Sequence, residues 1–373
     1  MKKALLLAPM SSVHERFNIA NIGALSELGY EIHLAANFSI DDHAKSYKEE
    51  CQKKGIIIHG FPFSRHSLKK NIKYVTDIKQ LLRNESFDIV HAHTETGGLL
   101  LRLSLQSNHS SKYIYTAHGM SFYKGSSVKS QMVYKPIEKF ICSKMDRNIA
   151  INDEEYEYLK SWNKDTAVYI HGAGFDIGAI ETALPDTAKK SELGIPVDRK
   201  MILSVGELNE NKNHQVIIKA ISGIPAEKRP TLLICGEGEK RDELIRLAEQ
   251  FHCRDFLFMP GYRYDMPEIF KSADLFVFPS YHEGLSFSLM QAMAAELPVI
   301  CTRIRGNTDL IDENKGGYFC SPDDPESVKK AIVDLMDNEI VCKRFGDYNH
   351  RKVQLFALQN VKRELRELYS EMK

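Results

Sequence analysis

Short apolar runs that alternate with stretches of helical spacing are the feature that most constrains the fold of this chain. In the first half these runs are residues 3–9, 32–36, 56–61, 88–92, 113–117, 147–151 and 167–170. Between them, apolar residues recur every three or four positions, as in residues 16–29. Buried strands that alternate with helices indicate an α/β fold with a parallel sheet. We therefore expect an open, doubly wound sheet of roughly seven strands here.

The same alternation begins again near residue 200. The second set of expected strands is residues 201–205, 231–235, 256–259, 275–278, 299–301 and 318–320. A chain of 373 residues comfortably makes two domains. We expect a Rossmann-like domain at 1–175, a second at 176–352, and an amphipathic helix at about 353–373. Ligands of such sheets bind outside the carboxyl ends of the strands, so two facing halves predict a central cleft.

The charge balance and the cysteines limit the class of protein. Lys plus Arg equals Asp plus Glu at 50 each, so we expect no nucleic-acid partner. The seven cysteines are scattered and never spaced as Cys-x-x-Cys, which is typical of reduced core residues in a cytosolic protein. Residues 4–8 are too short an apolar run for a secretion signal. The sequence therefore predicts a cytoplasmic protein.

Residues 276–298 carry the strongest functional signal. An apolar run stops at Pro279, a polar turn with Glu283 and Gly284 follows, and Ser286 opens a stretch of helical spacing. A strand-to-helix junction directs unpaired N–H groups and the positive end of the helix dipole into the loop, where a phosphate can bind. Glu283 would then lie beside the hydroxyl groups of a phosphate-linked sugar. The alternative is an ordinary strand-to-helix turn.

Other strand ends in the second half add cations and glycines on the same side. Lys212 lies at a predicted helix start, and Gly236 and Gly238 permit close backbone approach after the next strand. After the following strand, Tyr262 offers a ring for base stacking and Arg263 a cation. Each feature alone is weak, and each has a structural alternative as a solvated side chain or a turn. Together they favour a ligand site.

In the first half, histidines end two of the expected strands. His91 and His93, followed by Thr94, end one strand, and His118 follows another on its loop. Such histidines can hydrogen-bond a sugar or a leaving phosphate, although a structural role is equally compatible with His91. Ser11 follows the first strand, in its loop. The chain has no Asp-x-Asp and no Gly-x-Ser-x-Gly, so we expect neither a metal site nor a serine nucleophile elbow.

Over nearly its whole length the chain resembles the GT-B glycosyltransferases of family 4. The resemblance rests on four motifs: residues 282–294 (HEGLSFSLMQAMA), 205–214 (VGELNENKNH), 236–238 (GEG) and 116–119 (TAHG). Residues 91–98 and 116–125 are similar to transferases that build capsule, exopolysaccharide or O-antigen units in bacteria. Such proteins have two Rossmann-like domains facing a cleft, and their last helix commonly returns to the first domain.

The resemblance implies retaining transfer from a UDP-sugar with no cofactor and no required metal. It assigns catalytic roles to Glu283, which would bind donor-sugar hydroxyls, to Lys212, and to His118, which would touch the sugar or the diphosphate. The diphosphate would be held by Lys212 and by the backbone of Gly284, Leu285 and Ser286. The remaining donor-side residues would be Gly206, Glu207, Gly236, Gly238, Arg263 and Gln291, and those on the acceptor side Ser11, His93 and Thr94.

Two positions depart from the family pattern. Gln291 stands where the family has a glutamate that grips the ribose. An amide can still accept and donate hydrogen bonds there, but it loses the charge-assisted contribution of about 1 kcal/mol. Glu207 stands where the family often has arginine, so Lys212 must neutralise more of the diphosphate. These departures keep open a regulatory partner without activity, and a nucleotide-sugar 2-epimerase of the same fold is the enzyme alternative.

Basic stretches in the first half suggest a membrane contact. Residues 65–83 carry six cations against one acid, and residues 124–147 carry six more against two acids. Such a surface can rest on anionic lipid, and a solvated helix face is the alternative. It would suit a polyprenyl-diphosphate-linked saccharide as acceptor and a peripheral position on the inner face of the cell membrane.

Overall fold

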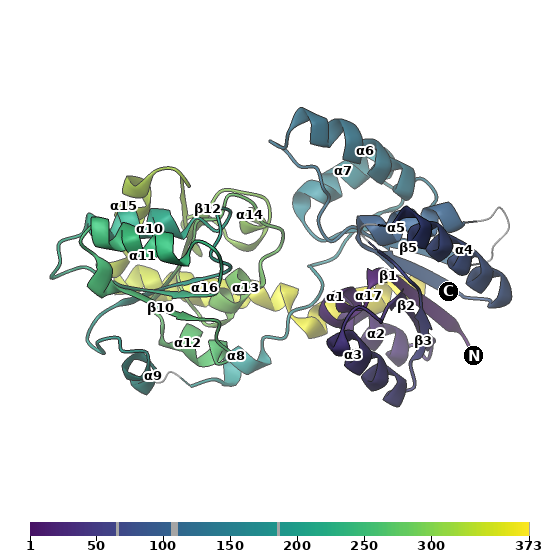
Figure 1. Cartoon of the computed structure of the whole chain (residues 1–373), viewed down its shortest axis with the longest axis horizontal. Coiled ribbons are helices and arrows are strands. Elements are labelled where there is room, and N and C mark those ends of the chain that lie inside the picture. Colours follow the sequence, from purple (N-terminus) through teal and green to yellow (C-terminus); the bar gives the residue numbers. More distant parts are fainter. Residues whose placement is uncertain (65–66, 106–110, 185–186, 373) are drawn as a thin grey trace. The chain divides into compact units, whose positions relative to one another are not determined.

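The computed structural model of the chain describes residues 1–64, 67–105, 111–184 and 187–372. It divides into two compact units (Figure 1). Unit 1 contains Met1–Gly174 and the chain from Leu358 onward, and unit 2 is Phe175–Ala357. Each unit is a parallel sheet with helices on both faces.

The sheet of unit 1 has the strand order β3-β2-β1-β4-β5-β6-β7, and every pair of neighbours is parallel. In the described residues its strands are β1 (Lys3–Met10), β2 (Glu31–Asn37), β3 (Ile57–Gly60), β4 (Ile89–His93), β5 (Lys112–Thr116), β6 (Arg147–Ala150) and β7 (Ala167–Tyr169). All seven strands expected from the apolar runs are confirmed.

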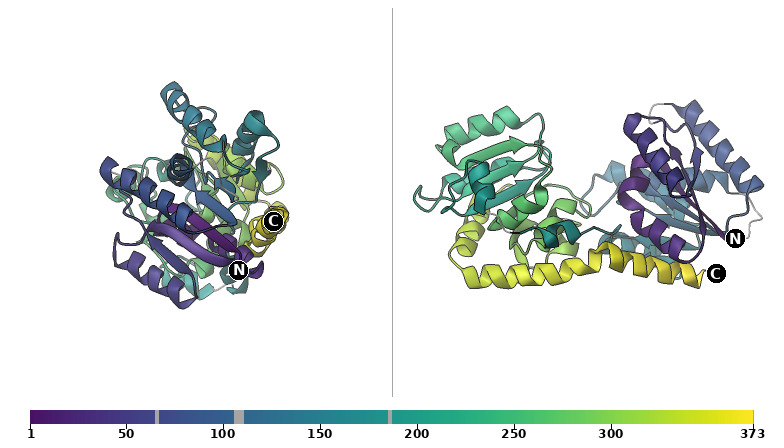
Figure 2. Two further views of the ribbon diagram at one scale, coloured as in Figure 1. Left: turned by 90° about the vertical axis from the view of Figure 1, so that its right-hand side faces the viewer. Right: turned by 90° about the horizontal axis from the view of Figure 1, so that it is seen from below.

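The helices of unit 1 form two layers. They are α1 (Ser11–Phe17), α2 (Ile19–Glu27), α3 (Asp42–Lys53), α4 (Leu68–Asn84), α5 (Thr94–Ser104), α6 (Val128–Cys142), α7 (Asp153–Asn163) and α17 (Leu358–Glu371). Successive residues of β1 point to opposite faces of the sheet. Leu6 packs with α2, α3 and α17 on one face, and Leu7 packs with α4 to α7 on the other. Figure 2 shows α17, the yellow helix at the end of the chain, running along one side of the unit 1 sheet.

A carboxylate lies inside the second of these layers. Glu138 of α6 is fully buried, and both of its oxygens accept from Tyr115 Oη, at 3.1 and 3.0 Å. Burial raises the pKa of Glu138 to about 8. The side chain is therefore largely protonated in the folded protein at neutral pH.

Replacing Glu138 with glutamine should make the stability of unit 1 less dependent on pH. Between the ordinary pKa of 4.5 and about 8, the folded chain keeps a proton that the unfolded chain releases. This contribution is fully present below pH 4.5 and is lost as the pH rises towards 8, by up to about 1.4 kcal/mol per pH unit. In denaturant unfolding, the unfolding free energy of Glu138→Gln should rise relative to that of the natural protein as the pH rises. A difference in unfolding free energy that does not change with pH would contradict this.

The sheet of unit 2 has the strand order β10-β9-β8-β11-β12-β13 and is also parallel. Its strands are β8 (Met201–Val205), β9 (Thr231–Cys235), β10 (Leu257–Gly261), β11 (Leu275–Phe278), β12 (Val299–Thr302) and β13 (Gly317–Cys320). These match the second set of apolar runs, so the predicted pair of Rossmann-like domains is confirmed.

Helices cover both faces of this sheet as well. They are α8 (Gly178–Thr182), α9 (Thr187–Glu192), α10 (His214–Ser222), α11 (Arg241–Gln250), α12 (Met266–Ser272), α13 (Phe287–Ala294), α14 (Asn307–Leu310), α15 (Pro325–Met336) and α16 (Glu339–Val353), with 3-10 turns η1 (Arg254–Phe256) and η2 (Gln354–Phe356). One core lies between the sheet and α8, α12 and α13, and the other beneath α10, α11 and α15.

The terminal helix begins later than its amphipathic pattern predicts. Val353 ends α16, and the chain passes through η2 before α17 starts at Leu358. Phe356 lies within the range expected for that helix but is instead buried in the core of unit 2, where its carbonyl accepts from Phe175 N–H at 3.0 Å. Tyr369 of α17 is buried in unit 1, where its hydroxyl accepts from Asn21 Nδ2 at 2.8 Å.

Both strand orders reverse direction at one point, and this point positions the candidate site. In unit 1 the reversal lies between β1 and β4, and in unit 2 between β8 and β11. Ligands of open α/β sheets bind at such a switch point, outside the carboxyl ends of the strands.

None of the helices in the described part of the chain is long and apolar enough to cross a membrane.

Candidate functional site

At the switch point of unit 2, two residues 71 positions apart in sequence form an ion pair. Lys212 follows β8 and Glu283 follows β11, and Lys212 Nζ lies 2.7 Å from Glu283 Oε1. The Lys212 ammonium also lies 4.8 Å from the centroid of the Phe278 ring. The two side chains are only 20% and 12% exposed. The structure thus brings two of the predicted catalytic residues into direct contact.

Local backbone capping holds Lys212 in place. Its N–H donates to Asn209 Oδ1 at 3.1 Å, which closes a turn before α10. Asn213, the next residue, has φ of 52°, in the left-handed region that asparagine tolerates better than most residues. The backbone that carries the Lys212 side chain is therefore held by the turn conformations of Asn209 and Asn213.

The loop that carries Glu283 ends at the start of α13. The Ser286 hydroxyl accepts from Leu289 N–H at 3.4 Å and caps the helix. Gly284 is exposed, and its carbonyl lies so close to Gly306 that a Cβ on Gly306 would come within 1.9 Å of it. Gly284, Leu285 and Ser286 thus lead into a helix N-terminus, the geometry that binds a phosphate.

A pocket of about 450 Å³ lies at the same edge of the unit 2 sheet. Five residues predicted on the donor side line it, namely Gly206, Glu207, Gly236, Arg263 and Gln291. Its size is within the range of small-molecule and cofactor sites. Gly238, Gly284, Leu285 and Ser286 do not line this pocket.

Glycines let the loops after β8 and β9 approach closely enough to form the pocket. A Cβ on Gly236 would lie 1.9 Å from Gly206 O, and one on Gly238 would lie 2.5 Å from Leu208 O. Hydrogen bonds join the loops, from Gly206 N to Cys235 O at 3.0 Å and from Leu208 N to Glu237 O at 2.8 Å. Gly238 therefore shapes the loop that supports the pocket.

The charges at the pocket differ from what the sequence suggested. Arg263, expected to help neutralise a diphosphate, donates to Asp265 Oδ1 at 2.7 Å and to Glu192 Oε1 at 2.8 Å. The guanidinium holds the pKa of Asp265 well below its usual value. Glu207 lines the pocket and accepts from Asn209 Nδ2 at 3.0 Å. Arg263 is shared between two carboxylates, whereas Lys212 pairs with the Glu283 carboxylate alone, so Lys212 is better placed to neutralise a bound anion.

In unit 1, His93 and His118 lie together at the carboxyl ends of β4 and β5. His93 Nδ1 and His118 Nε2 are 2.9 Å apart, and the His118 ring packs 5.0 Å from the Phe17 ring. His118 has φ of 58°. Burial lowers the pKa of His118 to about 4 and that of His93 well below its usual value, so both rings are neutral near pH 7.

The other acceptor-side candidates follow neighbouring strands at the switch point of unit 1. Ser11 is buried and begins α1 directly after β1, so the expected loop there is instead a helix start. Thr94 follows β4 with φ of 67°, a strained conformation for a β-branched residue. His91 has the structural role left open above, with Tyr369 Oη and Thr116 Oγ1 each at 2.8 Å from its ring nitrogens.

Some residues that line the pocket, among them Met266 and Glu237, were not chosen from the sequence as functional residues. Met266 begins α12 and lines the pocket, although nothing in its surroundings in the sequence marks it. Glu237 also lines the pocket, within the Gly-Glu-Gly motif that drew attention only to its glycines. Tyr262, considered above as a stacking ring, lines the pocket and is 63% exposed.

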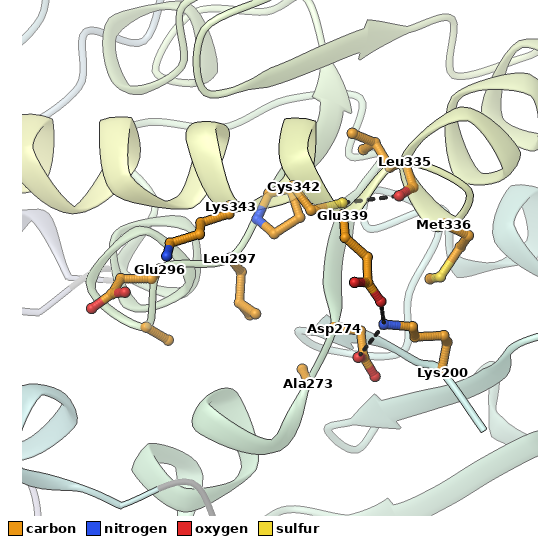
Figure 3. Close-up of a pocket in the computed structure, with 12 residues that line it drawn as sticks. Lys200, Ala273, Asp274, Glu296, Leu297, Leu335, Met336, Glu339, Cys342 and Lys343 are labelled. Carbon is orange, nitrogen blue, oxygen red and sulfur yellow. Dashed lines mark hydrogen bonds and ion pairs between the residues drawn. The ribbon is translucent and has the colours of Figure 1, made fainter. Parts of the chain in front are cut away.

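Another pocket, of about 360 Å³, lies at the opposite edge of the unit 2 sheet (Figure 3). Lys200, Asp274 and Pro298 of its lining each precede a strand directly. Lys200 Nζ lies 3.4 Å from Asp274 Oδ1 and 3.6 Å from Glu339 Oε1. These charged groups are matched to one another, and ligands of parallel sheets bind at the other edge. The candidate site is therefore the one beside Lys212.

Among the residues that the structure describes, no three His, Cys, Asp or Glu side chains are grouped so as to hold a metal ion. Of the positive groups, Arg263 lines the pocket, and Lys212 lies outside the lining but packs against Gly206, which is part of it.

Two family models match the chain, one for each half. The model described as Glycosyltransferase Family 4 matches residues 15–176, and that described as Glycosyl transferases group 1 matches residues 185–352. Together with the two parallel sheets, these matches define a glycosyltransferase with the GT-B fold. The chain belongs to glycosyltransferase family 4, as its motifs predicted.

Relatives and solved structures extend this picture. Putative glycosyltransferase EpsD of Bacillus subtilis is 29% identical, over 99% of this chain and 96% of its own. An Escherichia coli relative, UDP-Gal:alpha-D-GlcNAc-diphosphoundecaprenol alpha-1,3-galactosyltransferase, is 26% identical over 82% of this chain and 81% of its own. The structure of Anabaena Alr3699/HepE in complex with UDP has the same fold, with a TM-score of 0.80, 16% identity and complete coverage of both chains.

Proposed function

We propose that this glycosyltransferase moves a sugar from a UDP-sugar to a saccharide acceptor with retention of configuration at the anomeric carbon. The observation that carries the proposal is the Lys212–Glu283 pair at the switch point of unit 2, at the same sheet edge as a pocket of about 450 Å³. The UDP in the Anabaena structure and the UDP-Gal in the name of the Escherichia coli relative support a uridine nucleotide.

Each group at the switch point has a place in this reaction. Glu283 binds hydroxyl groups of the donor sugar, and the Lys212 ammonium with the N–H groups of residues 284–286 stabilises the diphosphate. The bond between the anomeric carbon and the diphosphate oxygen breaks, and the acceptor oxygen bonds to the same face of that carbon. The acceptor proton passes to the leaving diphosphate. These groups supply the positive charge, so no metal is required.

The nucleotide occupies the pocket in this proposal. The Gln291 amide hydrogen-bonds the ribose in place of the family's glutamate, at a cost of about 1 kcal/mol. The Glu207 carboxylate repels the diphosphate, which further lowers the affinity. Tyr262 offers an exposed ring for the base. The expected affinity for UDP is therefore moderate.

The acceptor in this proposal is a polyprenyl-diphosphate-linked saccharide used in bacterial surface polysaccharide synthesis. The diphosphoundecaprenol in the name of the Escherichia coli relative supports this class. Ser11, His93 and Thr94 would bind it through hydrogen bonds, and His118 would touch the donor sugar or the diphosphate from the acceptor side; both histidines are neutral near pH 7. Such an acceptor would place the enzyme in the cytoplasm, at the inner face of the membrane.

Product analysis tests this function. The full chain is incubated with a panel of UDP-sugars and a polyprenyl-diphosphate-linked saccharide, and the product is examined by NMR. The proposal predicts that one donor gives a longer lipid-linked saccharide whose new bond keeps the donor's anomeric configuration. An epimerised nucleotide sugar formed without acceptor would favour the 2-epimerase instead, and an inverted product would contradict retention.

Exposed cations beside apolar side chains in unit 1 support contact with an anionic membrane. On α4, Ile72 is 59% exposed between the exposed Lys70 and Lys73. On α6, Val128 is 74% exposed and Met132 73% exposed. Basic side chains with protruding apolar groups suit the headgroup region. Arg65, counted among the cations above, lies outside the described residues.

Reversing the charge of Lys69, Lys70 and Lys73 together to glutamate should abolish sedimentation with anionic vesicles. These side chains are exposed on α4, and their attraction to acidic lipid is screened by salt. Lys45 and Lys53 are exposed on α3, and Lys54 is exposed directly after it. Reversal of these three lysines changes the net charge equally and should leave sedimentation unaltered. Sedimentation that survives the α4 reversal would contradict the membrane contact.

A further inference from the structure

We propose that Asn211 is a positioning residue that holds the Glu283 loop against Lys212. The proposal rests on the proposed function, in which Glu283 and Lys212 bind the two ends of the sugar-phosphate linkage. It assigns to Asn211 a role in the rate of transfer and not in the binding of the nucleotide.

Three hydrogen bonds join Asn211 to the loop after β11. Asn211 Nδ2 donates to His282 O at 2.9 Å, and His282 N–H donates to Asn211 Oδ1 at 3.0 Å. The backbone carbonyl of Asn211 accepts from Tyr281 N–H at 2.9 Å. The side-chain amide thus pairs with a peptide unit as a neighbouring strand would.

This pairing requires an amide side chain of this length. A planar carboxamide carries a donor and an acceptor side by side, and both are used here. An aspartate would keep the acceptor for His282 N–H but would place a carboxylate oxygen against His282 O. Alanine would keep only the backbone bond to Tyr281.

The pairing of Asn211 with His282 affects Glu283 because Glu283 directly follows His282 in sequence, as Lys212 directly follows Asn211. Asn211 binds His282, and the next residue on each side, Lys212 and Glu283, forms the ion pair at 2.7 Å. Asn213 extends the contact by donating from Nδ2 to Pro279 O at 3.3 Å. Loss of the amide pairing would therefore free the Glu283 loop to shift relative to the cation.

A small shift of this loop should affect turnover more than nucleotide affinity. A displacement of about 1 Å in a catalytic group can cost up to about a hundredfold in rate. The nucleotide pocket is lined by neither Asn211 nor His282. We expect Asn211→Ala to lower kcat between about tenfold and a hundredfold. The Kd for UDP should change less, since the pocket residues are untouched and the Ser286 cap still holds the start of α13.

The experiment compares Asn211→Ala and Asn211→Asp with a control in the same loop. The control is Glu210→Gln, because Glu210 pairs with Lys240 and not with the Glu283 loop. Two readouts are measured on the full chain: kcat with the Kd for UDP, and hydrogen exchange at the His282 amide. Asn211→Ala should exchange faster there than the natural protein, Asn211→Asp should remain partly protected but lose kcat, and Glu210→Gln should match the natural protein.

The exchange measurement needs no substrate, so it separates this proposal from the assignment of a UDP-sugar. Faster exchange at His282 in Asn211→Ala, with normal exchange in Glu210→Gln, supports the positioning role even if no transfer is detected. Unchanged exchange in Asn211→Ala would overturn it. A parallel loss of kcat and UDP affinity in Asn211→Ala would also overturn it, since that pattern indicates general unfolding of the site.

Discussion

Replacing Glu283 with alanine should reduce sugar transfer by at least about a hundredfold while the fold is retained. Removal of one preorganised hydrogen-bonding group from a transition state typically costs this much. Glu283 is held 2.7 Å from Lys212 on a loop braced from both sides, so its carboxylate is already oriented. Measurement of kcat at saturating UDP-sugar checks this. Near-normal turnover in Glu283→Ala would contradict the role given to the carboxylate.

Two comparisons make the Glu283 result specific. Glu283→Gln keeps the shape and the hydrogen-bonding atoms but loses the charge, so it should retain more activity than Glu283→Ala. The Lys212–Glu283 pair is mostly buried, so removal of the carboxylate also leaves the ammonium without its partner, which should cost about 1–3 kcal/mol in unfolding free energy. A large fall in unfolding temperature in Glu283→Ala would mean that lost structure, and not lost chemistry, explains the rate.

Replacing Gly236 with alanine should damage the nucleotide pocket itself. The new Cβ would lie 1.9 Å from Gly206 O, a backbone atom that cannot rotate away, and Gly236 has φ of 151°. The loops after β8 and β9 must then separate, which we expect to cost about 3 kcal/mol from strain and overpacking. Thermal unfolding and calorimetric titration with UDP should both report large losses.

A second glycine serves as the control for Gly236. Gly60 ends β3 in unit 1, and a Cβ placed there meets nothing within 4 Å. Gly60→Ala should therefore leave both the unfolding temperature and UDP binding nearly unchanged. If Gly236→Ala behaves like Gly60→Ala, the close approach of the two loops does not form the nucleotide site.

Strands and site loops were predictable because their signals are local in the sequence. Buried parallel strands are continuous apolar runs, and each expected run is a strand in the structure. The loops after β8 and β11 could be chosen because glycine, lysine and glutamate stand directly after those runs. The sequence alone therefore identifies residues that lie at the carboxyl end of a strand.

Contacts across the sheet could not be predicted in the same way. The pairing of Lys212 with Glu283 depends on the conformations of two loops far apart in sequence. Arg263 was read as a free cation because its partner Glu192 is distant in the chain, although Asp265 is only two residues away. The late start of α17 could not be predicted either, because Phe356 fits the helical pattern but is buried in a core of unit 2.

Calorimetric titration of the full chain with UDP tests the nucleotide site of unit 2 without any acceptor. We expect one UDP to bind per chain, with lower affinity in Lys212→Ala, because the ammonium neutralises the diphosphate, and almost no binding in Gly236→Ala. Glu210→Gln, in the same loop as Lys212, should bind UDP as the natural protein does. No heat of binding to the folded natural protein would contradict a nucleotide site in unit 2.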